Sequence, residues 1–314
     1  MRILVAGGAG FIGSHLLDRL VARSDVDQIV IVDNLWTGLG KNFAHLLRLN
    51  KVEFLNEDVE SIGNIGPFDE IYHLASPATP LHYMQHPTRT ISANVAGAFR
   101  LLEQLKTGGL FCYTSTSEVY GDTTVSPQPE SYRGAVDCTG PRAAYDESKR
   151  CVEALLFGEH RVSGTRVKVA RVFNVYGPRT RADDGRAVSN FVSQALRGQP
   201  ITVFGDGNQQ RCWGFVDDIV AGLARFFWED GADFPGPLNI GNDQEISVRD
   251  IAEFVRSRFP GSKIKFLPPI PQDPVNRRPD LTLARQILPG WECAVQYEEG
   301  IDRTISWFRR EMNT

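Results

Sequence analysis

The sequence has few cysteines, and those it has are scattered. No CxxC pair and no cysteine–histidine spacing typical of a zinc site or a redox pair is present. Reduced thiols in a cytoplasmic protein are the simplest account of this usage, and we predict no metal. The five cysteines are Cys112, Cys138, Cys151, Cys212 and Cys293.

Long apolar runs and an excess of positive charge are also lacking. No apolar run approaches the roughly 20 residues that a membrane-spanning helix needs, and a first strand expected at Arg2 leaves no room for a signal peptide. The formal net charge of −4 gives no general attraction to nucleic acid or to anionic membranes. We therefore expect neither as a partner, and an anionic substrate would need local arginines.

The first motif is a glycine turn between an apolar strand and a helix. The strand Arg2–Ala6 is followed by Gly7, Gly10 and Gly13, and a helix is predicted over Phe11–Arg23. The first glycine permits the tight turn, the second lets a pyrophosphate approach the backbone, and the third lets helix and strand pack closely. The free N–H groups at the helix start then face the phosphates.

An acidic residue completes the dinucleotide pattern. A second strand, Gln28–Val32, ends at Asp33, twenty residues after Gly13. A carboxylate at this position hydrogen-bonds the ribose hydroxyls and repels a 2′-phosphate, which favours NAD over NADP. The other residues predicted to contact NAD are Phe11, Ile12, Asn34, Thr37, Gly38, Asp58, Val59, Leu74, Ala75, Ser76, Tyr145 and Lys149.

We predict the catalytic residues at the end of a buried strand, where a segment rich in hydroxyl side chains follows. The apolar run Leu110–Tyr113 is followed by Thr114–Glu118, and open α/β sheets bind ligands at such strand ends. Tyr145 and Lys149 lie four residues apart on a predicted helix and so share one face. A free tyrosine titrates near pH ~10, but a nearby ammonium, often together with a nicotinamide cation, favours the phenolate. With Thr116 adding a hydrogen bond, the pattern predicts a base that deprotonates an alcohol as hydride leaves carbon.

The pattern of elements predicts a doubly wound parallel sheet (Rossmann) with a smaller mixed α/β substrate domain. We place a soft boundary at residue 178, giving an NAD-binding domain 1–178 and a nucleotide-sugar-binding domain 179–314, with segments that can interleave. The second part has three arginine-bearing loops, 179–190, 205–211 and 273–280, which suit a diphosphate and a carboxylate.

Two amphipathic helices are predicted near 90–106 and 145–161. The second has an apolar stripe, Val152, Leu155 and Leu156, that one layer of the domain does not obviously cover. It could pair with a symmetry mate in a homodimer, or it could contact the C-terminal part of its own chain.

These motifs together resemble the extended short-chain dehydrogenase/reductases that act on nucleotide sugars, and within them most of all the UDP-glucuronate decarboxylases, also called UDP-xylose synthases. The resemblance spans nearly the whole chain. It is carried by GGAGFIGSH, DNLWTG, HLASP, TSTSEVYGD, GPRAAYDESKR, RVFNVYGPR, DDGRAVSNF, GDGNQQR and NRRPD. The pair Ser117–Glu118 and the arginine Arg277 match the decarboxylases best.

The resemblance implies a reaction and its residues. Tyr145, assisted by Lys149 and Thr116, would deprotonate the sugar 4-hydroxyl while hydride passes to NAD; the 4-ketone would then allow carbon dioxide to leave, and the returning hydride would give UDP-xylose. Ser117, Glu118 and Arg277 would position the carboxylate and manage proton delivery. The implied substrate-binding residues are Tyr83, Thr116, Glu118, Asn174, Arg186, Val188, Ser189, Asn190, Phe204, Gln209, Arg211 and Arg277.

The sequence departs from this family near the sugar and nucleotide. Arg133 stands where a tryptophan is common, Ser148 where the decarboxylases often show glycine, and Gln210 and Cys212–Phe215 differ from the usual uridine-side residues. Other outcomes therefore stay open at the level of sequence. They are a UDP-glucuronate 4-epimerase, another nucleotide-sugar epimerase or dehydratase, and a catalytically silent NAD-binding sensor.

Overall fold

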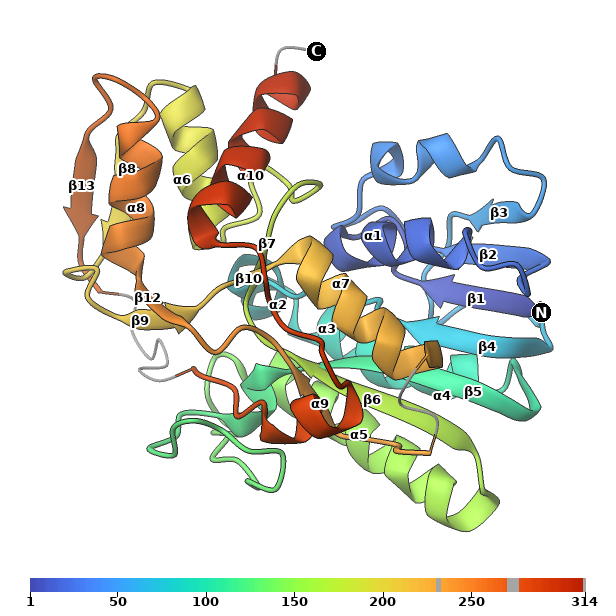
Figure 1. Cartoon of the computed structure of the whole chain (residues 1–314). Coiled ribbons are helices and arrows are strands. Elements are labelled where there is room, and N and C mark those ends of the chain that lie inside the picture. The colour runs from blue at the N-terminus through green and yellow to red at the C-terminus, as the bar shows by residue number, and fades with distance from the viewer. Residues whose placement is uncertain (230–232, 270–276, 313–314) are drawn as a thin grey trace.

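A seven-stranded parallel sheet forms the centre of the molecule (Figure 1). The computed structural model describes residues 1–229, 233–269 and 277–312. The strand order, β11-β6-β5-β4-β1-β2-β3, contains the 3-2-1-4-5-6 order of dinucleotide-binding sheets, so the predicted fold class is confirmed. The strands are β1 (Arg2–Ala6), β2 (Gln28–Val32), β3 (Val52–Leu55), β4 (Phe68–His73), β5 (Leu105–Thr116), β6 (Arg166–Val172) and β11 (Leu238–Ile240).

Alternation along each strand builds two cores, one on each face of the sheet. On β1, Ile3 and Val5 join the core under helices α1 (Phe11–Leu20) and α7 (Val216–Ala224). Leu4 and Ala6 point the other way, because successive strand side chains face opposite sides. The opposite face is covered by α3 (Pro87–Ile91), a π-helical segment (Ser92–Ala96), α4 (Gly97–Leu102) and α5 (Ala143–Ser163).

The structure refines two details of the helical predictions. The helix predicted to reach Lys106 ends at Leu102, and Leu105 already belongs to β5; Gly108, with φ of +77°, lies in this strand entry. Of the predicted apolar stripe, Val152 and Leu156 are fully buried against the sheet of their own chain, whereas Leu155 is only partly buried at the edge of this core.

The C-terminal part forms a smaller mixed unit beside the carboxyl ends of the strands (Figure 1). Strands β8 (Ile201–Phe204) and β13 (Ile264–Leu267) pair in parallel, and β9 (Gln210–Cys212) and β12 (Glu245–Ser247) pair antiparallel. Other elements of the part after β6 are β7 (Val175–Tyr176), α6 (Ala187–Leu196), β10 (Gly214–Phe215), α8 (Val248–Ser257), α9 (Thr282–Ile287) and α10 (Tyr297–Met312). The short helix α2 (Pro80–Gln85) follows β4.

The chain crosses between the two parts more than once. Strand β11, from the second half of the sequence, pairs with β6 at the edge of the large sheet. The division into 1–178 and 179–314 stays a prediction, with this strand as an interleaved segment. All five cysteines are unpaired within the described ranges, and no helix there has the length and apolar character needed to span a bilayer.

Candidate active site

The glycine turn leaves no room for side chains where β1 meets α1. Gly7 has φ of +85°, and a Cβ there would lie 2.5 Å from the Ala75 nitrogen. A Cβ on Gly13 would lie 2.1 Å from the Gly7 carbonyl oxygen, so any larger residue would break the packing of helix on strand. The result is a bare backbone cradle at a helix N-terminus, which fits the diphosphate of a dinucleotide.

Asp33 connects the glycine turn to the loop after β2 through hydrogen bonds. Its carboxylate accepts hydrogen bonds from the Ala9 N–H (3.0 Å) and the Leu35 N–H (2.9 Å). Burial raises the pKa of Asp33, which the two backbone donors partly oppose. Since each carboxylate oxygen accepts more than one hydrogen bond, ribose contacts by Asp33 remain available and stay a prediction.

The predicted adenosine side is organised around a second acidic residue. The Asn34 amide donates to the Asp58 carboxylate, and the Arg89 guanidinium lies 3.4 Å from the same oxygen. Arg89 also stacks over Trp36, 4.0 Å from its ring centroid. The Val59 side chain, in contrast, is buried in the core and packs against Gly97 of α4, so closely that a Cβ on Gly97 would clash with it.

A cavity of about 420 Å³ opens at the carboxyl ends of the strands and brings most predicted residues together. Every predicted catalytic and substrate-binding residue lines it. So do eight of the other predicted cofactor residues, Gly7, Gly10, Phe11, Ile12, Gly13, Thr37, Leu74 and Ser76. The predicted residues outside its lining, all within the described ranges, are Asp33, Asn34, Gly38, Asp58, Val59 and Ala75.

The tyrosine–lysine pair lies on α5 under the cavity. The Lys149 ammonium donates to the Thr114 carbonyl (2.8 Å) and lies 5.9 Å from the centroid of the Tyr145 ring. Burial lowers the pKa of Lys149 to about 7, although Glu153 opposes this. Burial also raises the pKa of Tyr145 to about 12, while a hydrogen bond with Thr116 lowers it.

Within the chain alone, burial outweighs the neighbouring groups and raises the pKa of Tyr145, because desolvation penalises the phenolate. The lowering expected from Lys149 together with the nicotinamide charge of bound NAD stays a prediction. Thr116, Lys149 and Tyr145 are nevertheless held together in one buried group.

Glu118 is held between two arginines. It pairs with Arg142 and, at 3.2 Å, with Arg277, whose guanidinium also donates to the Gly121 carbonyl oxygen (2.8 Å). Burial acts to raise the pKa of Glu118, but the charges of Arg277 and Arg142 outweigh it and lower that pKa. We call Glu118, Arg142 and Arg277 the arginine clamp; its formal charge is +1, which suits an incoming carboxylate.

Arg142 was missed by the sequence reasoning. It immediately precedes α5, three residues before Tyr145, and its guanidinium lies 5.8 Å from the ring centroid of Tyr83. A signal existed: a buried glutamate in a substrate pocket needs cationic partners, and Arg142 is one turn from Tyr145, the predicted base. Residues 273–276 of the third predicted arginine loop lie outside the described residues.

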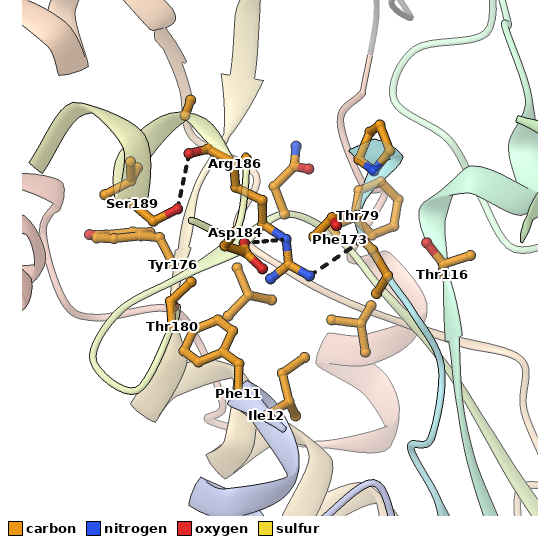
Figure 2. A pocket seen from close by; sticks show the side chains of 18 of the residues that line it. Phe11, Ile12, Thr79, Thr116, Phe173, Tyr176, Thr180, Asp184, Arg186 and Ser189 are labelled. Atoms are coloured by element: carbon orange, nitrogen blue, oxygen red, sulfur yellow. Dashed lines mark hydrogen bonds and ion pairs between the residues drawn. The ribbon is translucent and has the colours of Figure 1, made fainter. Parts of the chain in front are cut away.

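A third arginine, Arg186, approaches the cavity from the residue just before α6. Figure 2 shows the Arg186 guanidinium reaching into the cavity above Phe11 and Ile12. It lies 3.2 Å from the Asp184 carboxylate and 3.4 Å from the Ala78 carbonyl oxygen, while the Ser189 hydroxyl donates to the Arg186 carbonyl oxygen. Its charge also acts to lower the pKa of Tyr145. It is therefore placed to meet an anionic group between the helix start and the phenol.

The far end of the cavity carries the predicted nucleotide residues. Gln209 donates its amide to the Phe204 carbonyl oxygen (3.1 Å), and Arg211 donates to the Gln210 carbonyl oxygen (2.8 Å). These residues come from β8, β9 and the turn between them. One cavity thus runs from the glycine cradle, past Tyr145, to a polar pocket of the smaller unit.

Comparison with known proteins places this geometry in a family. Residues 3–241 match the model of the NAD dependent epimerase/dehydratase family. "UDP-glucuronic acid decarboxylase 3" of Arabidopsis thaliana is 44% identical over 100% of this chain and 90% of its own length. "UDP-glucuronic acid decarboxylase 1" of Danio rerio is 43% identical over 99% of this chain and 73% of its own length.

Solved structures agree on the fold. UDP-glucose 4-epimerase from Thermotoga maritima, solved with UDP-glucose, is 30% identical with a TM-score of 0.85, covering 99% of this chain and 100% of that one. UDP-glucuronic acid 4-epimerase from Bacillus cereus, solved with UDP-glucuronic acid and NAD, is 26% identical with the same TM-score and coverage. The chain belongs to the NAD dependent epimerase/dehydratase family.

Proposed function

We propose that this protein is an enzyme that decarboxylates UDP-glucuronate to UDP-xylose through a 4-keto intermediate, with NAD regenerated in each turnover. The observation that carries the proposal is the arginine clamp, which lies in the same cavity as Thr116, Tyr145 and Lys149. In glucuronate the substituent on C5, next to the 4-hydroxyl, is a carboxylate, which is the group that two arginines favour. Relatives that are 43 to 45% identical bear the decarboxylase name.

NAD would be held by the glycine cradle, the start of α1 and the Asp33 loop, which fit it because side chains are excluded there. When bound, NAD supplies a hydride acceptor and a positive charge that favours the phenolate. The chain itself provides the base, Tyr145, and holds the proton that Tyr145 takes from the sugar 4-oxygen. Thr116 hydrogen-bonds that phenol, and the Lys149 ammonium lies 5.9 Å from the centroid of its ring.

The arginine clamp would bind the carboxylate of the sugar before it leaves. Once C4 is a ketone, the carboxylate is β to it; the C5–C6 bond can break, carbon dioxide departs, and the electron pair moves to the 4-oxygen as an enolate. C5 then takes one proton, and hydride returns to C4. The reaction therefore consumes one proton overall and no reductant. Glu118, kept anionic by the clamp, orients both guanidinium groups.

A UDP-glucuronate 4-epimerase is the second candidate. It is favoured by the solved UDP-glucuronic acid 4-epimerase that covers 99% of this chain with a TM-score of 0.85. Both reactions use the same 4-ketone and need the same base. They differ in whether the C5 carboxylate survives.

Product analysis tests the proposal. Purified protein is incubated with UDP-glucuronate without added reductant, and the products are identified by NMR and mass. UDP-xylose and one equivalent of carbon dioxide support decarboxylation. UDP-galacturonate with its carboxylate intact would replace the proposal with the epimerase, and no conversion of any UDP-sugar would favour an NAD-binding sensor.

The homodimer predicted from the sequence stays part of this proposal. The helical segment from α3 to α4 packs beside α5 and exposes two large apolar side chains, Ile91 (46% exposed) and Phe99 (53%). We expect a second copy to cover them. Light scattering should give twice the chain mass, and Phe99→Glu should reduce it to the monomer.

A further inference from the structure

A buried carboxyl group beside the catalytic tyrosine has no role in the mechanism above. Asp146 follows Tyr145 in the first turn of α5 and is only 6% exposed. Its Oδ1 atom is buried without a hydrogen-bond partner among the described residues. Buried polar atoms almost always have a hydrogen-bond partner, and burying an ionised carboxylate without one is especially costly.

The charged groups around Asp146 come from several elements. Arg142 and Glu147 lie on or next to its own helix, Glu118 and Arg277 belong to the arginine clamp, and the Tyr83 phenol faces it from α2. Burial raises the pKa of Asp146 to about 7, and the charge of Glu118 adds to this, while Arg142 and Arg277 oppose it. Asp146 therefore sits near the midpoint of its titration at neutral pH.

The formal charges explain what a carboxylate ligand would do. The arginine clamp carries +1 and becomes neutral when Asp146 is ionised. A carboxylate that enters the cavity brings this buried cluster to −1 if Asp146 stays ionised, and to zero if Asp146 is protonated. An added negative charge near a carboxyl group favours its neutral form.

We propose that Asp146 takes up a proton when the carboxylate of a nucleotide-linked hexuronate binds in the arginine clamp, so that ligand and proton enter the site together. The inference rests on the proposed function, because it assumes a uronate as ligand. Asp146 does not line the cavity, so it is a positioning residue that sets the charge of the clamp rather than a catalytic residue.

Such a proton matches the needs of the reaction. When carbon dioxide departs, the clamp loses the negative charge of the ligand, so the pKa of Asp146 falls back to its value in the ligand-free protein. At the same step C5 needs one proton. The proton that Asp146 takes up when the ligand binds, at most one per site, offsets the one proton that the overall reaction consumes. No other reactant is required.

Calorimetry of the NAD-loaded protein tests the inference. The ligand is UDP-4-deoxy-4-fluoroglucuronate, which lacks the 4-hydroxyl and cannot be oxidised there. Titrations in buffers of different ionisation enthalpy give the number of protons taken up. We expect more than about half a proton at pH 7.5 and close to none at pH 5.5, where Asp146 is already protonated in the free protein. The 4-deoxy-4-fluoro analogue of UDP-glucose, without the carboxylate, should give no uptake at either pH.

The variant Asp146→Asn separates Asp146 from other groups. It should bind the fluoroglucuronate analogue without proton uptake, and unchanged uptake would overturn the inference. If the variant fails to fold, the parent protein still tests the inference, because binding of the fluoroglucuronate analogue without proton uptake at pH 7.5 would also overturn the inference. Failure of the uronate assignment on which the inference rests looks different: the parent would then not distinguish the uronate analogue from its glucose counterpart in affinity, whereas failure of decarboxylation alone shows only in the product analysis above.

Discussion

The ring of Tyr83 stacks on the ring of Tyr145, with centroids 4.8 Å apart and planes inclined by 8°. Tyr83 comes from α2, which follows β4, whereas Tyr145 lies on α5 after β5. The Tyr83 hydroxyl is buried without a partner among the described residues. The contact fixes the plane of the Tyr145 ring, so we expect the short helix α2 to support the proposed base although it follows a different strand.

Replacement of Tyr83 separates its ring from its hydroxyl. Tyr83→Phe keeps the stack and should retain most activity, whereas Tyr83→Ala should lower kcat by about tenfold, since an aromatic pair is worth roughly 0.5–1.5 kcal/mol beyond its buried area. Steady-state kinetics on UDP-glucuronate measure this. Equal losses in both variants would show that the hydroxyl, not the stack, matters.

Tyr145→Phe should remove the base and little else. The ring and its stack on Tyr83 remain, but no oxygen can take the proton of the sugar 4-hydroxyl. We expect kcat to fall by about 10²–10⁴-fold, with bound NAD, measured by absorbance after denaturation, unchanged. Turnover close to that of the parent would refute the assignment of Tyr145 as the base.

Arg277→Ala should impair carboxylate handling more than nucleotide binding. The buried guanidinium contacts both Glu118 and the Gly121 carbonyl oxygen, and truncating one member of a buried charge pair costs about 2–5 kcal/mol. The value of kcat/KM for UDP-glucuronate should fall by at least about 30-fold, with Arg277→Lys intermediate. The affinity for UDP alone is the control. An equal loss of UDP affinity would indicate a structural role instead.

The sequence predicted the first two strands and the glycine turn well, because their signals are local. The strands Arg2–Ala6 and Gln28–Val32 lie where predicted, and the glycine spacing requires close backbone packing whatever surrounds it. The Tyr83–Tyr145 stack depends on a contact between distant segments, which no local spacing encodes. Burial, which dominates the pKa of Tyr145 within the chain alone, is likewise a property of the whole fold.

The pKa of Lys149 gives a prediction about stability. Burial lowers it from 10.5 to about 7, so the unfolded chain binds this proton over a pH range in which the folded chain does not. The contribution to stability is fully present above about pH 10.5 and is lost as the pH falls through about 7. Between pH 7 and pH 9, the free energy of unfolding of the protein freed of NAD should rise by about 2 kcal/mol relative to Lys149→Met.

Denaturant unfolding of both proteins at each pH measures this difference, in which other titrating groups cancel. A parent and a variant whose stabilities run in parallel from pH 7 to pH 9 would contradict the buried, readily deprotonated lysine.

The central claim is that a transient 4-ketone, formed and reduced on the same molecule, drives loss of the carboxylate. It is tested most directly with UDP-glucuronate deuterated at C4 and turned over in ordinary water, with the product examined by NMR and mass. The account predicts UDP-xylose that keeps its deuterium at C4, and, in a parallel run in heavy water with unlabelled substrate, a single deuterium at C5. Loss of the C4 label to solvent, or a product that retains its carboxylate, would contradict it.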